Sequence, residues 1–277
     1  MDTLRNIVIM VFSVLAVLAF QGCSAAPGSS AHDNTTDSAA VVAQSEGVRP
    51  GTPGGARGEM RDRYGRNATP EDPNPRTVAP YFTPATAIPR APDADGFVQR
   101  WMLLEPISNG LRSNAGFTES FVRDAFRTEY FPGQYEVTPK DGDKVTVNDE
   151  ELKWHALDSN TWNVKLFRFA YGVNKPFYGI TFFVYTVIDC PREIKDVRMA
   201  VGSNSASLWW LNREEAVGLF GDRRMVMDDC VSKRLTLKKG RNVIRGAVIN
   251  GPGMSDFCAR FIDEQGKPIK DFTINLE

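Results

Sequence analysis

The chain has 277 residues, with 33 Lys or Arg against 34 Asp or Glu, which gives a formal net charge of −1. Such a balanced charge lacks the basic excess of nucleic-acid-binding domains, so we expect no nucleic-acid partner. Hydrophobic residues make up 42% of the chain, which is enough for a globular core, but they are unevenly distributed along it.

Residues 1–22 have the pattern of an export signal. Arg5 supplies a positive charge, and residues 7–20 form an apolar run that is long enough for a signal-peptide core but short for a bilayer span. Gly22 directly before Cys23 is typical of a lipoprotein signal peptidase site, although Phe20 stands where such sites usually have Leu. We therefore expect acyl chains on Cys23 that anchor the protein in the cell envelope, at the outer membrane or the cell surface. An ordinary secretory peptide and an uncleaved N-terminal anchor are the alternatives.

Residues 23–95 are rich in Ala, Gly, Pro, Ser, Thr and Asp and contain few large apolar side chains. Such a segment cannot bury enough surface to offset the entropy lost on ordering. We predict a disordered tether that holds a domain away from a membrane.

Residues 96–277 contain all five Trp residues and have the length of one substantial domain. Short runs of apolar, aromatic and β-branched residues, many with period-two alternation, predict strands. These runs are residues 97–104, 152–157, 178–188, 197–201, 231–237, 243–249 and 257–262. One helix is predicted from Thr118 to Arg127, covering an open end of the fold. The expected fold class is an all-β antiparallel β-sandwich of the jelly-roll type with one short helix, preceded by the disordered linker.

Several motifs in residues 98–270 resemble those of galactose-binding-like jelly-roll domains in secreted bacterial proteins of polysaccharide degradation. They are the Trp-Met-Leu-Leu-Glu-Pro run at 101–106, Gly-Asp-Lys-Val at 142–145, the Gly-Ser turn at 202–203, Trp-Leu-Asn at 210–212 and the two closing hairpins. The resemblance implies a jelly roll, and relatives described as acetylxylan esterases or glycoside hydrolases. Two positions depart from the pattern. Asn204 and Ser205 replace the usual acidic pair, and Arg213 replaces the usual Gly, so the ligand cannot be carried over.

We assign no catalytic residues. Acyl transfer needs an activated nucleophile with a general base, and His155 is the one histidine of the predicted domain. No Gly-x-Ser-x-Gly elbow is present. The acidic residues that are candidates for glycoside hydrolysis have no diagnostic spacing and are more typical of solvated or ion-paired loop charges. They are Glu214, Glu215, Asp222, Asp228 and Asp229.

The sequence also gives no metal-ligand motif and no sign of a cofactor. His155 has no partner ligand, and a structural Ca²⁺ has no supporting spacing. Beyond Cys23, the cysteines are Cys190, Cys230 and Cys258. Any one pair of them, or none, is compatible with an oxidising envelope.

Aromatic residues carry the best binding hypothesis, because sugar rings pack their C–H faces on indoles while polar side chains bind the hydroxyl groups. Trp209 and Trp210 are adjacent on a strand and must face opposite ways, so one belongs to the core. The candidate ligand-binding residues are Trp162, Trp209, Trp210, Asn204, Asn212, Arg213, Arg223 and Asp228.

The sequence thus predicts a membrane-anchored, non-catalytic carbohydrate-binding or accessory module in polysaccharide utilisation. Its expected partners are a poly- or oligosaccharide, the membrane through the lipid anchor, and glycan-degrading enzymes. The alternatives are a carbohydrate-active hydrolase, either an acetylxylan esterase or a glycosidase, and a structural lipoprotein that binds another protein.

Overall fold

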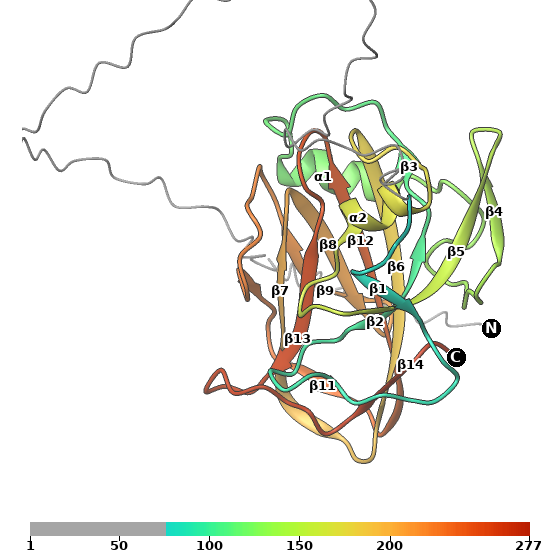
Figure 1. The fold of residues 1–277 in the computed structure, drawn as a ribbon. Coiled ribbons are helices and arrows are strands. Elements are labelled where there is room, and N and C mark those ends of the chain that lie inside the picture. The colour runs from blue at the N-terminus through green and yellow to red at the C-terminus, as the bar shows by residue number, and fades with distance from the viewer. Residues whose placement is uncertain (1–75) are drawn as a thin grey trace, which may run out of the picture.

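Two antiparallel β-sheets form the domain in this computed structural model, which describes residues 76–277 (Figure 1). The larger sheet has ten strands and follows the order β1-β5-β2-β6-β12-β8-β9, with β3, β4 and β14 paired at its margins. The smaller sheet has four strands, with β10, β11 and β13 all paired to β7. The protein is therefore an all-β antiparallel sandwich, as its sequence predicts.

The elements in chain order are β1 (Phe82–Pro84), β2 (Arg100–Leu104), β3 (Ile107–Ser108), α1 (Glu119–Arg127), β4 (Lys144–Val147), β5 (Glu150–Ser159), α2 (Leu166–Gly172), β6 (Ile180–Cys190), β7 (Ile194–Ser203), β8 (Ala206–Leu211), β9 (Glu214–Leu219), β10 (Cys230–Val231), β11 (Leu235–Leu237), β12 (Gly240–Asn250), β13 (Phe257–Ile262) and β14 (Thr273–Asn275).

The main core lies between the two sheets. The large sheet contributes Trp101 and Trp209 to it, and β13 of the small sheet contributes Phe257 and Phe261. Alternation along each strand places these side chains inward and their sequence neighbours outward. β6 and β12 run side by side over their whole length, which makes them the centre of the large sheet.

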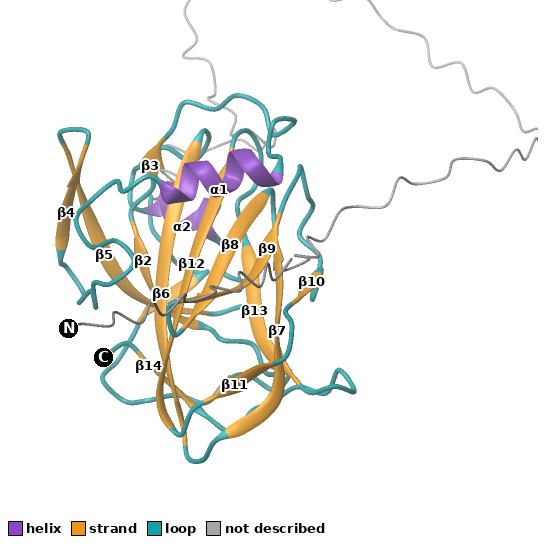
Figure 2. Cartoon of the chain, turned by 180° about the vertical axis from the view of Figure 1, so that it is seen from behind, coloured by secondary structure: helices purple, strands orange, loops and turns teal. Residues whose placement is uncertain are grey.

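A second apolar cluster covers part of the other face of the large sheet, which we call the outer face. Helix α1 packs there through Val122 and Phe126, and Figure 2 shows it crossing the upper ends of β6, β12 and β8. The Thr118 hydroxyl accepts a hydrogen bond from the Phe121 amide and so begins the helix. The predicted helix is thus present, but it covers a sheet face and not an open end of the sandwich.

Two features were not predicted. Strand β1 pairs with β5, so the ordered domain begins well before the boundary expected at residue 95. Helix α2 has the sequence LFRFAYG, a short apolar run that periodicity alone does not distinguish from a strand. The predicted signal peptide, Cys23 and the tether up to residue 75 lie outside the described residues. No helix within residues 76–277 is long and apolar enough to cross a bilayer.

Candidate functional site

One row of side chains runs across the outer face of the large sheet. Strand register places Met102 opposite Tyr185, Tyr185 opposite Arg245, and Arg245 opposite Trp210. Directly paired residues of antiparallel strands point to the same face, so these four side chains share a surface. Helix α1 covers another part of the same face of the sheet. The segment after the helix crosses the row at Arg245, which donates a hydrogen bond of 2.7 Å to the Val137 carbonyl.

An aromatic cavity of about 220 Å³ lies at the β8 end of this row, and we call it the Trp210 cavity. It is lined by Tyr135, Glu136, Trp210 and Arg213. The rings of Tyr135 and Trp210 lie with centroids 4.9 Å apart and planes tilted by 55°. Trp210 is half-buried, so part of its indole remains available to a ligand. The cavity combines an indole with a carboxylate and a guanidinium, the groups that bind the apolar face and the hydroxyl groups of a sugar.

Tyr135 is a fixed part of this cavity. Its hydroxyl donates a hydrogen bond to the Phe126 carbonyl at the end of α1. Burial raises the pKa of the Tyr135 phenol far above its ordinary value, so the ring stays neutral and keeps this hydrogen bond. The helix therefore positions the ring that supports Trp210.

The charged pair at the rim is loose. Arg213 Nη1 and Glu136 Oε1 are 3.9 Å apart, and both side chains are about two-thirds exposed (69% and 71%). An ion pair with this exposure is worth little and is easily exchanged for a ligand contact. Both groups are therefore accessible for binding.

Trp209 does not belong to this site, although the sequence analysis included it among the candidate ligand-binding residues. It is 0% exposed and packs against Trp101 and Phe257, with ring centroids 5.9 and 4.9 Å away. Its Nε1 donates a hydrogen bond of 2.9 Å to the Ser207 hydroxyl. Since β8 alternates between faces, Trp209 is the core indole and Trp210 the outer one.

Asn212 and Arg213 form the two-residue turn between β8 and β9. Their φ angles are 51° and 74°, as in a type I′ turn, whose second position favours Gly. The Asn212 side chain is used inside the fold, because its Oδ1 accepts from the Val243 amide and its Nδ2 donates to Asn242. Of the two predicted ligand residues, only Arg213 is free to project into the cavity.

Three other predicted ligand residues contact side chains or backbone away from the Trp210 cavity. Asn204 accepts a hydrogen bond from the Asp256 amide. Arg223 pairs with Asp229, with Nε and Oδ2 2.7 Å apart. Asp228 pairs with Arg260, a partner that sequence spacing did not reveal. None of the three lines the Trp210 cavity.

Trp162 is 37% exposed and belongs to a separate surface. Its ring centroid lies 5.4 Å from that of Phe97, which is itself bridged to Arg260 of the small sheet. The Arg260 guanidinium lies 4.8 Å above the Phe97 ring. Trp162 and Trp210 therefore do not form one binding surface.

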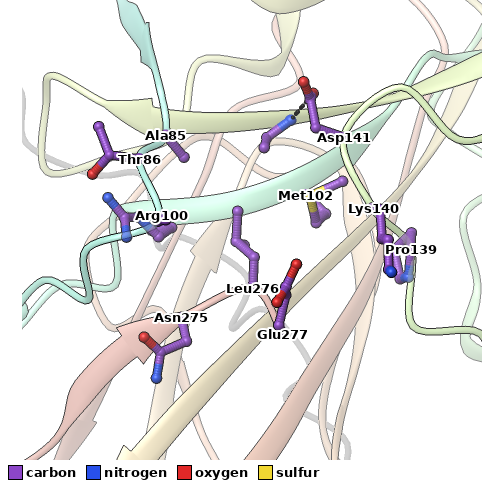
Figure 3. Close-up of a pocket in the computed structure, with 12 residues that line it drawn as sticks. Ala85, Thr86, Arg100, Met102, Pro139, Lys140, Asp141, Asn275, Leu276 and Glu277 are labelled. Atoms are coloured by element: carbon purple, nitrogen blue, oxygen red, sulfur yellow. Dashed lines mark hydrogen bonds between the residues drawn. The ribbon is translucent and has the colours of Figure 1, made fainter.

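A second cavity of about 330 Å³ lies at the opposite end of the row, near β2 and β5 (Figure 3). Met102, Lys140 and Asp141 line it, together with the side chain of Leu276. Arg100 forms part of its wall but is held by Asp158 through two hydrogen bonds of 2.8 and 2.9 Å. The lining residues come from five separate segments of the sequence, so no local pattern predicts this cavity.

Several residues weighed for catalysis contact other side chains of the fold. His155 Nε2 lies 2.9 Å from Glu105 Oε1, and Lys175 lies 3.4 Å from the other oxygen of that carboxylate. Glu215 pairs with Arg123 at 2.6 Å, and Asp222 accepts a hydrogen bond from Asn114. These contacts give Glu215 and Asp222 a role in the fold.

Within residues 76–277, no three His, Cys, Asp or Glu side chains are grouped in a way that could hold a metal ion. Cys190 and Cys258 are buried free thiols, so neither is part of a disulfide. Burial raises the pKa of Cys190 to about 11 and that of Cys258 to about 12. Both thiols are therefore protonated and unreactive at neutral pH.

Comparisons with known proteins give limited information. No family model matches the sequence, and no curated protein matches it. Among solved structures, the PA14 domain of the antifreeze protein MpAFP is similar, with 10% identity, a TM-score of 0.36, and coverage of 70% of this chain and 94% of that chain. The PA14 sugar-binding domain of an RTX adhesin gives 8% identity, a TM-score of 0.32 and coverage of 63% and 96%.

The A domain of a subtype-switched epithelial adhesin 9 from Candida glabrata, in complex with β-lactose, gives 12% identity, a TM-score of 0.32 and coverage of 70% and 96%. Because all three TM-scores are below 0.5, these likenesses carry no argument about a site or a ligand in this chain. None of the three is described as a galactose-binding-like domain, so that resemblance remains a prediction.

Proposed function

We propose that this protein is a non-catalytic carbohydrate-binding module that holds a sugar in the Trp210 cavity. The observation that carries the proposal is the half-buried Trp210 indole, supported by Tyr135 and flanked by the accessible Glu136 and Arg213. Rigid aromatic surface with adaptable polar neighbours is the combination that binds a sugar ring. The proposal agrees with the sugar-binding description of the RTX adhesin domain but does not rest on it.

Affinity electrophoresis of the full chain in gels containing xylan, galactan or pectate tests the proposal. We expect retardation by at least one polymer, lost in Trp210→Ala and retained in Trp162→Ala. Trp162 is a matched control because it is an exposed indole outside the cavity. Trp210→Tyr, which keeps an aromatic platform, restores part of the retardation and separates binding from folding. No retardation by any of the polymers, or equal loss in both Ala variants, contradicts the proposal.

The module is proposed to be anchored in the cell envelope through acyl chains on Cys23, next to enzymes that degrade the same glycan. This part rests on the apolar run of residues 7–20 and on Gly22-Cys23. Palmitate labelling that disappears in Cys23→Ala supports it, and unchanged labelling contradicts it. Assays for acetate and reducing-sugar release by the purified protein test the hydrolase alternative, with His155→Ala as the esterase control.

A further inference from the structure

Three arginines gather beside the Trp210 cavity on the outer face of the large sheet. Arg213 lines the cavity itself. The Arg245 guanidinium lies 5.0 Å from the centroid of the Tyr185 ring, and Arg241 donates a hydrogen bond of 2.7 Å to the Tyr185 hydroxyl. Both arginines therefore contact one tyrosine, and Arg245 lies between this tyrosine and Trp210 in the register row.

Carboxylates do not fully neutralise this cluster. Glu136 faces Arg213 only loosely, at 3.9 Å. Asp189 lies opposite Arg241 in the strand register, but it accepts a hydrogen bond from Asn275 while Arg241 donates to Tyr185. Arg241 and Arg245 thus make their hydrogen bonds to neutral groups, and Arg213 makes only the loose ion pair with Glu136.

Arg245 is buried, and its nearest hydrogen-bond acceptor is the neutral Val137 carbonyl. Burial lowers the pKa of Arg245, Arg213 and Arg241 lower it further, and Tyr185 and Glu136 oppose this effect. A buried guanidinium without a bound carboxylate raises the positive potential of the cavity beside it.

The backbone at Arg213 is a second feature of the cavity rim. Its φ of 74° lies in the left-handed region, where Gly is favoured and other residues are strained. Strained non-Gly residues occur at binding sites, where the surrounding structure holds them in place. An arginine is well suited to such a site, since its planar fork binds carboxylate and sulfate oxygens with two parallel hydrogen bonds.

We propose that the sugar bound in the Trp210 cavity carries an anionic substituent, a carboxylate or a sulfate ester, and that Arg213 binds this group. Arg241 and Arg245 supply the surrounding positive potential, and the Trp210 and Tyr135 rings pack against the sugar. This inference rests on the carbohydrate-binding function proposed above and specifies its ligand class as acidic glycans.

Calorimetric titration of the full chain with tetragalacturonate and with its methyl ester tests the inference, because esterification removes the charge and keeps the sugar. We expect the acid to bind at least tenfold more tightly than the ester, and added salt to reduce the difference. Arg213→Gly fits the turn and removes the guanidinium, so it should bind acid and ester equally. Glu136→Gln removes a competing carboxylate and should tighten binding of the acid several-fold. Arg127→Gln, at an exposed arginine of α1, is the matched control and should bind like the native chain.

Equal binding of acid and ester, or a preference for the acid that survives in Arg213→Gly, overturns the inference. If acid and ester bind equally to the native chain and neither binds to Trp210→Ala, the carbohydrate-binding function is still supported. If neither ligand binds, a sulfated galactan tetrasaccharide is titrated. Binding that depends on Arg213 then supports the inference with sulfate as the anion, and absence of binding overturns it. Failure of neutral and acidic glycans alike overturns both proposals.

Discussion

Trp209 and Trp210 are consecutive residues of β8 that lie on opposite faces of the large sheet. Trp209 packs against Phe257 in the core, with ring centroids 4.9 Å apart, and Trp210 packs against Tyr135 on the outer face, also at 4.9 Å. The same strand thus anchors the sandwich and presents the candidate binding surface, so the position of Trp210 depends on how firmly Trp209 is held.

Gly246 is what allows Trp209 to lie flat on the neighbouring strand. Register pairs the two residues, and a Cβ at position 246 would come within 2.4 Å of the Trp209 ring. We expect Gly246→Ala to lower the free energy of unfolding by about 1–3 kcal/mol through overpacking. Urea denaturation measures this.

Two further variants check the cause. Gly116→Ala, where the added Cβ meets nothing within 4 Å, should change stability by no more than about 0.5 kcal/mol. Combining Gly246→Ala with Trp209→Phe should cost less than the sum of the two single changes, because the smaller ring relieves the clash. Strict additivity would contradict the explanation.

The Arg100–Asp158 pair is expected to stabilise the edge of the sheet next to the second cavity. The Arg100 side chain is 4% exposed and that of Asp158 is 12% exposed, so neither charge is well hydrated. Arg100→Met leaves the Asp158 carboxylate with only its 3.5 Å contact to Arg90, so it should cost about 3 kcal/mol, while the double variant with Asp158→Leu should cost clearly less. Arg127→Met, which breaks an exposed pair with Asp124, should cost under about 1 kcal/mol. Equal losses in the buried and exposed single variants would contradict the prediction.

Asp256 makes stability depend on pH. Its Oδ2 accepts a hydrogen bond of 2.9 Å from Lys165, but its buried Oδ1 has no hydrogen-bond partner. Burial raises the pKa of this carboxyl above its ordinary value, against the opposing effect of Lys165. The folded state therefore holds the proton to higher pH than the unfolded state, so this group's contribution to stability falls as pH rises from the ordinary value through the raised one.

Asp256→Asn removes this titration while keeping the side-chain shape. Urea denaturation at several pH values from 3 upward should show the native chain losing stability relative to Asp256→Asn as pH rises through that interval. Asp124→Asn, at an exposed carboxylate of α1, should show no such divergence. Parallel stability curves for the native chain and Asp256→Asn would contradict the prediction.

Local patterns predicted the sandwich because the alternation of side chains along a strand can be recognised from neighbouring residues. The same alternation predicted that Trp209 and Trp210 lie on opposite faces of the sheet. Arg213 was noticeable because it replaces the Gly of the jelly-roll pattern, and the structure shows that this position lies in a turn that favours Gly. Tyr135 was missed, because it lies in a long connection and reaches Trp210 only through tertiary packing. The pairing of Asp228 with Arg260 and the lining of the second cavity were missed for the same reason, since sequence spacing says nothing about contacts between distant segments.

Indole N–H resonances in an NMR titration provide the most direct test of the Trp210 cavity as a sugar site. Each of the five tryptophans contributes one indole N–H resonance, and the indoles of Trp101 and Trp209 are buried and hydrogen-bonded inside the core. The titrant is an oligosaccharide fragment of a polymer that retards the protein. The Trp210 resonance should shift and saturate while those of Trp101, Trp209 and Trp162 stay in place. A saturating shift at Trp162 without one at Trp210, or no shift at any indole, would contradict carbohydrate binding in this cavity.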